Sequence, residues 1–267
     1  MKRLLLALLF ASAALAQSDP VSRSWNQPVK PFRIVGNLYY VGATDITSYF
    51  IATPKGHIVI DGGFVETAPQ ILANIRTLGF DPKDVRILLN SHAHYDHAGG
   101  LAELKRVTGA TFYASRGDIP QLARGGFDDP HFGNRFPFPP IEANRILEDG
   151  QRISLGGTTL VAHITPGHTP GCTTWTARIA GKHVVFVGSP TTPSDYKLTP
   201  PLIADYRRQF DTLKRLDCDI FLASHGNFFG LADIVAGRKK AADGAEYRAF
   251  VADVEKRFEE RVAALSR

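Results

Sequence analysis

The chain has 267 residues, and 31 Lys and Arg against 26 Asp and Glu give it a formal charge of +5 at pH 7. The basic residues are scattered and form no run, which argues against a nucleic-acid partner or a membrane-surface patch. The length suits one large domain or two small ones, and 44% of the residues are hydrophobic.

The N-terminus has the pattern of a secretory signal peptide. A charged start is followed by an almost wholly apolar run from Leu4 to Leu15, and Ala14-Leu15-Ala16 fits the small-x-small cleavage rule. The run is too short to span a bilayer. We therefore expect cleavage after Ala16, no membrane anchor, and a periplasmic mature chain of residues 17–267 that forms a single domain.

Short apolar runs in the first part of the chain predict a meander of antiparallel strands. These runs are residues 38–41, 48–51 and 57–60. His57 follows a turn glycine, and we expect it at the surface. Asp61 ends the meander, either as a turn former or as support for a nearby metal loop. A helix is predicted over 69–78, where apolar residues share one face before Gly79.

The densest cluster of chemically active residues follows the predicted buried strand 85–89. It has the order H-x-H-x-D-H, and a helix is predicted to begin at Leu101. Residues two apart in an extended segment point the same way, so His92 and His94 can reach one metal ion. The chain then turns, so Asp96 and His97 would reach a second ion. Imidazole and carboxylate at this density suit zinc.

The segment 124–140 is rich in Gly, Pro and Phe and predicts a long loop. Such a loop is either a working surface or lid, or a proline-rich cover over the core. We treat His131 within it as a non-ligand. Further strands are predicted at 152–155, 158–164, 173–179, 183–187 and 220–223, and helices at 202–216 and 247–262.

Two more histidines stand at predicted strand ends. His168 is at the centre of the Gly- and Pro-rich loop 165–171, and His225 follows the strand 220–223. Strands followed by helices, twice over and without a linker, predict an α+β domain of two sheets packed face to face with helices outside. The strand-end loops of both halves would then meet at one edge.

Five imidazoles and one carboxylate divide naturally into two zinc sites, each leaving a position for water. We expect one set to be His92, His94 and His168, and the other to be Asp96, His97 and His225. Metal coordination lowers the pKa of water from about 15.7 to about 7, which supplies a hydroxide nucleophile at neutral pH. The predicted reaction class is metal-assisted hydrolysis.

The H-x-H-x-D-H motif, the 165–171 loop and the late His225 resemble the metallo-β-lactamase superfamily. The resemblance implies an αββα sandwich of two mixed β-sheets with helices on the outer faces. The superfamily holds β-lactamases, thioesterases, lactonases and nucleases, so the fold does not choose among them. Several segments are similar to the third subclass of metallo-β-lactamases: residues 25–28, 36–42, 90–100, 132–138, 167–175 and 225–230.

The resemblance implies a zinc-dependent β-lactamase with two Zn2+ per chain that hydrolyses penicillins, cephalosporins and carbapenems and so confers antibiotic resistance. Asp96 would be both a metal ligand and the catalytic residue that orients the attacking hydroxide. Ser189 and Thr191 would contact the carboxylate of a bound β-lactam, the alternative being that they are turn hydroxyls. We expect a monomer whose partner is this small-molecule substrate.

The alternative function is another hydrolase of the superfamily, acting on lactones or thioesters. Many such enzymes carry a metal-bridging aspartate after the strand matching 184–187, where this chain has Gly188-Ser189-Pro190. A non-catalytic zinc-binding protein is the alternative from another class.

The chain has two cysteines, Cys172 and Cys218, which could form a disulfide bond. Export permits them to pair, but the sequence does not fix the distance between them. A cysteine ligand to zinc is the competing idea, although the histidines already supply a full set. In the β-lactamases that the chain resembles, a cysteine near Cys218 often pairs with one close to the C-terminus, and this chain has no cysteine there. The sequence of residues 191–195 also differs from that of these relatives.

Overall fold

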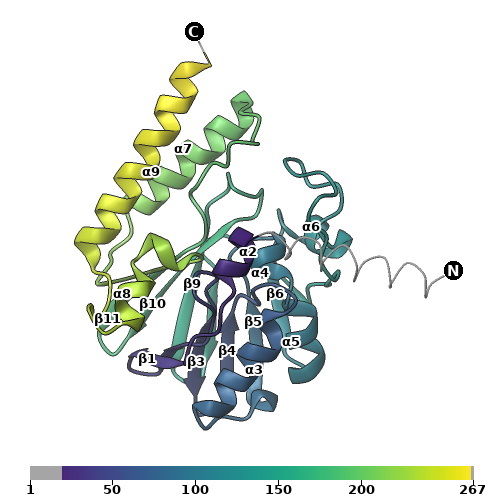
Figure 1. Cartoon of the computed structure of the whole chain (residues 1–267), viewed down its shortest axis with the longest axis vertical. Helices are drawn as coiled ribbons and strands as arrows, with labels where there is room; N and C mark the ends of the chain where they lie inside the picture. Colours follow the sequence, from purple (N-terminus) through teal and green to yellow (C-terminus); the bar gives the residue numbers. More distant parts are fainter. Residues whose placement is uncertain (1–19, 266–267) are drawn as a thin grey trace, which may run out of the picture.

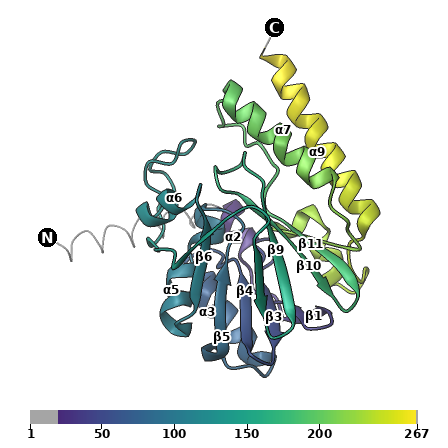
Figure 2. The ribbon, with the colours of Figure 1, turned by 180° about the vertical axis from the view of Figure 1, so that it is seen from behind.

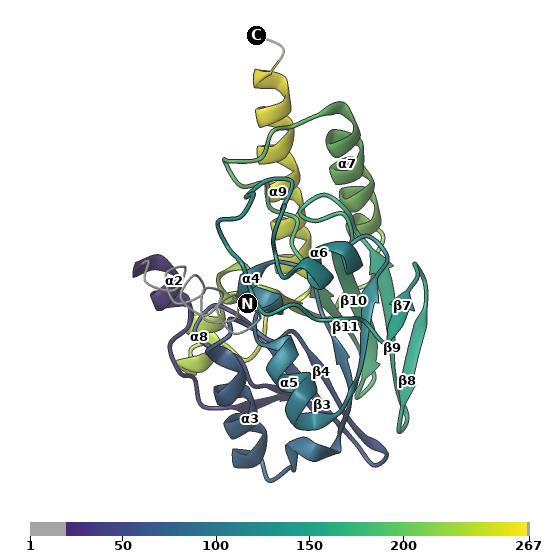
Figure 3. The ribbon, with the colours of Figure 1, turned by 90° about the vertical axis from the view of Figure 1, so that its right-hand side faces the viewer.

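The computed structural model describes residues 20–265, so the predicted signal peptide lies outside the described residues. Within this part of the chain, two β-sheets pack face to face, as Figure 2 and Figure 3 show from two sides. No helix among residues 20–265 is long and apolar enough to cross a bilayer.

The first sheet has seven strands in the order β1-β2-β3-β4-β5-β6-β7. The first four strands are antiparallel, which confirms the predicted meander, and β4 to β7 run parallel. The sequence missed β1 and β7, because these edge strands are only four and three residues long and each includes an arginine among its apolar residues. The strands are β1 Phe32–Val35, β2 Leu38–Tyr40, β3 Tyr49–Thr53, β4 Gly56–Ile60, β5 Val85–Leu89, β6 Thr111–Ser115 and β7 Arg145–Leu147.

The second sheet has five strands in the order β12-β11-β10-β9-β8. All its neighbours are antiparallel except β11 and β12, so both sheets are mixed, as the resemblance implied. Its strands are β8 Arg152–Leu155, β9 Thr158–Ile164, β10 Thr173–Ile179, β11 Lys182–Val187 and β12 Ile220–Ala223, close to the predicted bounds.

Helices α3 (Thr67–Thr77) and α5 (Leu101–Thr108) share one apolar cluster with the first sheet and cover its outer face (Figure 3). Helices α7 (Pro200–Lys214) and α9 (Gly244–Ala264) pack on each other, and α9 also contacts β12. The shorter helices are α2 Pro20–Trp25, α4 Tyr95–Ala98, α6 Ile119–Arg124 and α8 Leu231–Val235, with 3-10 turns η1 Pro82–Asp84 and η2 Gly226–Phe228.

The core between the sheets is built from large buried side chains of both. Tyr49 of β3 and Phe186 of β11 meet there with ring centroids 5.1 Å apart. The Tyr49 hydroxyl donates to the carbonyl of Ala223 at 2.6 Å and accepts from its N–H at 3.2 Å, which joins the two sheets by a polar contact. The predicted αββα fold is confirmed.

The structure decides two questions outside the site, the pairing of the two cysteines and the exposure of His57. Cys172 and Cys218 are free thiols, the first buried and the second half-buried, so the disulfide does not form. The prediction that His57 lies at the surface is wrong. Its ring is buried against Phe50 and Phe80, and burial lowers its pKa.

Candidate metal centre

The H-x-H-x-D-H residues lie at the carboxyl end of β5, where the chain changes from extended to helical. His94 is still extended, with φ −102° and ψ 157°, and α4 begins at the next residue. The extended part directs His92 and His94, and the first turn of α4 directs Asp96 and His97 elsewhere. All four side chains are buried. The local change of backbone conformation therefore gives the two pairs different directions, which suits two adjacent metal sites that both lie close to His92.

The first set of three ligands, which we call the first triad, comprises His92, His94 and His168. Their ligand atoms lie within 4.8 Å of one another, and His94 Nδ1 is 3.1 Å from His168 Nε2. Zinc binds histidine nitrogens at roughly 2.0–2.1 Å, so neighbouring ligand atoms of a tetrahedral site lie about 3.3 Å apart. His94 and His168 thus have the separation of neighbouring zinc ligands, and His92 lies close enough to complete a set of three imidazole donors.

The second triad comprises Asp96, His97 and His225, and the end of β12 supplies the third residue. Asp96 Oδ2 is 3.4 Å from His97 Nε2 and 3.6 Å from His225 Nε2, and the two nitrogens are 3.3 Å apart. His92 also lies within 4.8 Å of Asp96 and His97. We assign His225 to the second triad, because its Nε2 lies at close to the tetrahedral separation from both Asp96 and His97, whereas His92 also belongs to the set with His94 and His168.

Each histidine of the two triads has a polar group near its other ring nitrogen, at hydrogen-bond distance for His92, His168 and His225 and at the longer ion-pair distance for His94 and His97. The partners are Ser91 Oγ for His92 Nδ1 (3.0 Å), Asp129 Oδ2 for His94 Nε2 (3.5 Å), Asp61 Oδ2 for His97 Nδ1 (3.6 Å), the Thr191 carbonyl for His168 Nδ1 (2.9 Å) and Asp45 Oδ2 for His225 Nδ1 (2.9 Å). Metal-binding histidines are held in this way, which fixes the tautomer and leaves one nitrogen free for the ion. Within the described part of the chain, His92 Nε2 is buried with no hydrogen-bond partner, as a ligand nitrogen would be, and His94 Nε2 and His97 Nδ1 are likewise buried without a hydrogen bond although each faces a carboxylate.

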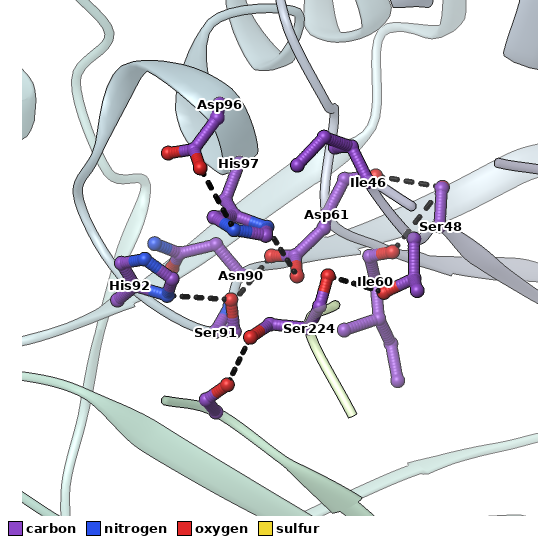
Figure 4. A network of polar contacts seen from close by, with 12 residues as sticks. Ile46, Ser48, Ile60, Asp61, Asn90, Ser91, His92, Asp96, His97 and Ser224 are labelled. Carbon is purple, nitrogen blue, oxygen red and sulfur yellow. Dashed lines mark hydrogen bonds and ion pairs between the residues drawn. The ribbon is translucent and has the colours of Figure 1, made fainter. Parts of the chain in front are cut away.

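Figure 4 shows how Asp61 supports the loop. Its carboxylate accepts from the Ser91 N–H at 2.6 Å and also faces His97, while its own φ is +66°. A positive φ is uncommon for a residue other than glycine and is typical of a turn. Asp61 therefore serves both of the roles that the sequence left open.

The electrostatics of the second triad favour a cation. Burial alone would raise the pKa of Asp96, but the neighbouring His97 and His225 outweigh it and hold that pKa well below its usual range. Burial lowers the pKa of His97, yet the carboxylates of Asp96 and Asp61 raise it to about 10. The metal-free site thus keeps a proton on His97, and a metal ion that binds there takes the place of this positive charge.

In the first triad the histidine pKa values are lowered, in contrast to that of His97. Burial, together with the neighbouring histidines, lowers the pKa of His92 and His168 well below the usual value. Both rings are therefore neutral at neutral pH, which is the form that binds a metal ion.

Sequence reasoning missed two carboxylates of the site, Asp45 and Asp129. Asp45 lies in the irregular segment between β2 and β3, and its Oδ1 also accepts from the Asn227 N–H at 2.7 Å. Asp129 lies in the 124–140 loop. Asp45 has no ligand-like neighbour in the sequence, and Asp129 stands two residues before His131, which we treat as a non-ligand, so Asp129 alone had a weak local signal.

The 124–140 loop packs directly on the ligand segment. The ring of Phe132 is 5.2 Å from that of His94, and Phe136 stacks on Tyr95 with centroids 4.5 Å apart. His131, predicted as a non-ligand, stacks on Tyr196. These contacts favour the interpretation that the loop is a wall of the site over the interpretation that it only covers the core.

The predicted substrate residues follow β11 and adjoin the first triad. Ser189 is buried, and its Oγ is 3.1 Å from Thr191 Oγ1. The Thr191 carbonyl accepts from His168 Nδ1 at 2.9 Å and from the Tyr206 hydroxyl at 2.8 Å. The structure thus places both hydroxyls on the segment that supports a predicted ligand.

Comparison with known proteins decides the family. Residues 41–225 match the family model described as the metallo-beta-lactamase superfamily.

The chain belongs to the metallo-β-lactamase superfamily.

Among solved structures, it is similar to a metallo-β-lactamase with a HARLDQ motif from Cronobacter sakazakii, with 43% identity and a TM-score of 0.88 over 91% of this chain and 97% of that one. It is also similar to BJP-1, a subclass B3 metallo-β-lactamase of Bradyrhizobium japonicum, with 32% identity and a TM-score of 0.83 over 91% and 97% of the two chains. The HARLDQ motif of the Cronobacter protein has Arg at its third position and Gln at its sixth. The corresponding segment of this chain, residues 92–97, has His94 and His97 at these positions.

The curated relatives match over a smaller part of the chain. An N-acyl homoserine lactonase, AttM, from Azorhizobium caulinodans is 30% identical over 49% of this chain and 59% of its own length. The chain thus spans about three-fifths of the length of that lactonase.

Proposed function

We propose that the protein is a zinc-dependent β-lactamase that hydrolyses the β-lactam amide bond of penicillins, cephalosporins and carbapenems with two Zn2+ per chain. The observation that carries the proposal is the pair of adjacent triads with ligand atoms 3.1–3.6 Å apart where the distances are known, in which every imidazole has a polar group near its non-ligating nitrogen. Similarity to metallo-β-lactamases over about nine-tenths of the chain supports the choice of substrate.

His92, His94 and His168 would hold one ion, and Asp96, His97 and His225 the other. Bound zinc supplies Lewis acidity toward a carbonyl and lowers the pKa of a water molecule. Asp96 stays ionised, because its pKa is held low, and a carboxylate has two oxygens that accept hydrogen bonds. One oxygen faces His97 and His225, and the second can accept a hydrogen bond from the attacking water and so orient it.

Ser189 and Thr191 would bind the carboxylate of the β-lactam. Their hydroxyl oxygens are 3.1 Å apart, so both hydroxyls can turn toward one anionic group. Without substrate they satisfy each other, which is the contact that the alternative of plain turn hydroxyls also predicts. Substitution of each by Ala distinguishes the two, because only substrate contacts raise KM.

The lactone or thioester alternative is favoured by the curated relatives, but these match over a smaller part of the chain than the metallo-β-lactamases do. It also predicts a bridging carboxylate after β11, where the chain has Gly188-Ser189-Pro190. We further propose that the mature chain acts as a monomer in the periplasm, which size-exclusion mass measurement and cell fractionation test.

The deciding experiment measures hydrolysis of a carbapenem and a cephalosporin by the purified mature protein, with and without a chelator. We expect turnover that the chelator removes and added zinc restores. Two bound zinc ions without β-lactam turnover would contradict the proposal, and turnover of an acyl homoserine lactone or a thioester in the same assay would support the alternative.

A further inference from the structure

The segment Thr191–Tyr196, which we call the strap, lies between the end of β11 and the start of α7 and has irregular backbone. Both of its ends contact His168 of the first triad. The Thr191 carbonyl accepts from His168 Nδ1 at 2.9 Å, and the Tyr196 hydroxyl donates to the His168 carbonyl at 2.7 Å. The position of the strap therefore sets the orientation of one predicted metal ligand.

One residue outside the site holds the middle of the strap. Arg261, in the last turn of α9, donates from Nη1 to the carbonyls of Thr192 (3.0 Å) and Pro193 (2.6 Å), and from Nη2 to those of Ser194 (2.9 Å) and Tyr196. The planar guanidinium has five N–H donors in a fixed arrangement, and charged donors form stronger hydrogen bonds than neutral ones. A single side chain thus gathers four carbonyls of a segment that has no strand or helix to order it.

The helix that carries Arg261 gives it a fixed base. Phe258, one turn earlier, is buried against Tyr206 and Phe210 of α7, with ring centroids 4.9 and 5.5 Å apart. Tyr206 in turn donates to the Thr191 carbonyl. The packed pair α7 and α9, which rises above the strands in Figure 1, is therefore connected to the metal ligands through the strap.

Other contacts to the strap are weaker candidates for this role. The ion pair between Arg135 and Asp195 is about half exposed on both sides, and exposed ion pairs contribute little. The backbone bond from the Tyr196 N–H to the Pro193 carbonyl lies within the strap and does not fix it to the rest of the molecule. Arg261 provides the charged anchor between the strap and a packed helix.

We infer that Arg261 is a positioning residue that holds the strap so that the Thr191 carbonyl orients His168 and the Thr191 hydroxyl faces the substrate. The part about His168 depends on the contacts alone. The part about substrate rests on the proposed function. Arg261 lies outside the two triads and is assigned no contact with substrate, so it acts through Thr191.

The test compares Arg261→Met, which removes all donors but keeps an apolar stem, with Arg261→Lys, which keeps the charge and three donors. Arg257→Met is the matched control, because Arg257 lies one turn earlier on α9, is exposed and pairs with Asp253. The first measurement is the solvent-exchange rate of the His168 Nδ1–H proton in the zinc-loaded protein, followed by NMR. We expect exchange to be about tenfold faster in Arg261→Met, intermediate in Arg261→Lys and unchanged in the control.

The second measurement is steady-state kinetics with a carbapenem. We expect KM to rise about tenfold in Arg261→Met, because the Thr191 hydroxyl no longer faces the substrate, with kcat within a factor of about two, because the Tyr196 hydroxyl still contacts His168 and all three ligands of the first triad remain. Unchanged His168 exchange in a folded Arg261→Met protein would overturn the inference. If Arg261→Met does not melt cooperatively, the inference is judged from Arg261→Lys. A His168 Nδ1–H exchange rate in Arg261→Lys equal to that of the wild type then overturns the inference. An absence of β-lactam turnover in the wild type would contradict the proposed function. The role of Arg261 in orienting His168 would then be tested by the exchange rate alone.

Discussion

Replacement of Asp45 by Asn should weaken one metal site and spare the other. The Asp45 side chain is 11% exposed, and its two oxygens accept from His225 Nδ1 at 2.9 Å and from the Asn227 N–H at 2.7 Å. An amide has one oxygen and one NH2 group. Whichever way the new amide turns, one of the two N–H donors faces an NH2 group and loses its acceptor.

The size of the effect follows from these contacts. A buried donor that loses its acceptor costs about 1–3 kcal/mol, and about 1.4 kcal/mol corresponds to a tenfold change in affinity. We therefore expect zinc to bind the second triad about 10- to 100-fold more weakly in Asp45→Asn, in line with the usual effect of losing a partner of a ligating histidine. Affinity for the first triad should be unchanged.

The assay is a competitive zinc titration that resolves two dissociation constants in wild type and variant. The control is Asp129→Asn, whose carboxylate faces His94 of the first triad at 3.5 Å. This variant should weaken the first site, and by less, because the contact is longer. Equal weakening of both sites in Asp45→Asn, or no weakening, would refute the assignment of His225 to a separate second triad.

Three further outcomes are expected. Asp96→Ala should abolish β-lactam turnover and lose the second zinc; a fully loaded and active variant, by kcat and metal analysis, would contradict the role of Asp96. Burial raises the pKa of Asp118 to about 6 in the folded protein, so proton binding to Asp118 stabilises the folded state. This stabilisation is fully present below about pH 4 and is lost as the pH rises through about 6. Between pH 4 and 7, the free energy of unfolding of the metal-free wild type should fall by about 3 kcal/mol relative to Asp118→Asn, measured by urea unfolding, and parallel pH profiles would refute this. Tyr49→Phe removes the acceptor of the buried Ala223 N–H, whereas the Ala223 carbonyl keeps its hydrogen bond from the Thr47 hydroxyl at 2.8 Å. The variant should therefore be destabilised by about 1–3 kcal/mol in the same assay, and an unchanged midpoint would show that the contact between the sheets contributes nothing.

The sequence alone determined most of the fold, because local apolar periodicity indicates where strands and helices form. The buried run Val85–Leu89 appears in the structure with the same bounds, and the central and second-sheet strands agree within a residue or two. The edge strands β1 and β7 were missed, because four and three residues are too few to establish a period. The H-x-H-x-D-H spacing likewise indicated a metal motif divided between two directions, since the division arises within six consecutive residues.

Only the tertiary structure decided what surrounds the ligands. Asp45 and His225 are 180 positions apart in sequence, and Arg261 reaches carbonyls 65 to 69 positions away. No local pattern encodes such pairs, because they arise when β12 and α9 pack against distant segments. The same reason explains His57, which a turn glycine placed at the surface and two phenylalanines bury. Local sequence determined which residues could bind metal, and long-range packing decided how each of them is held.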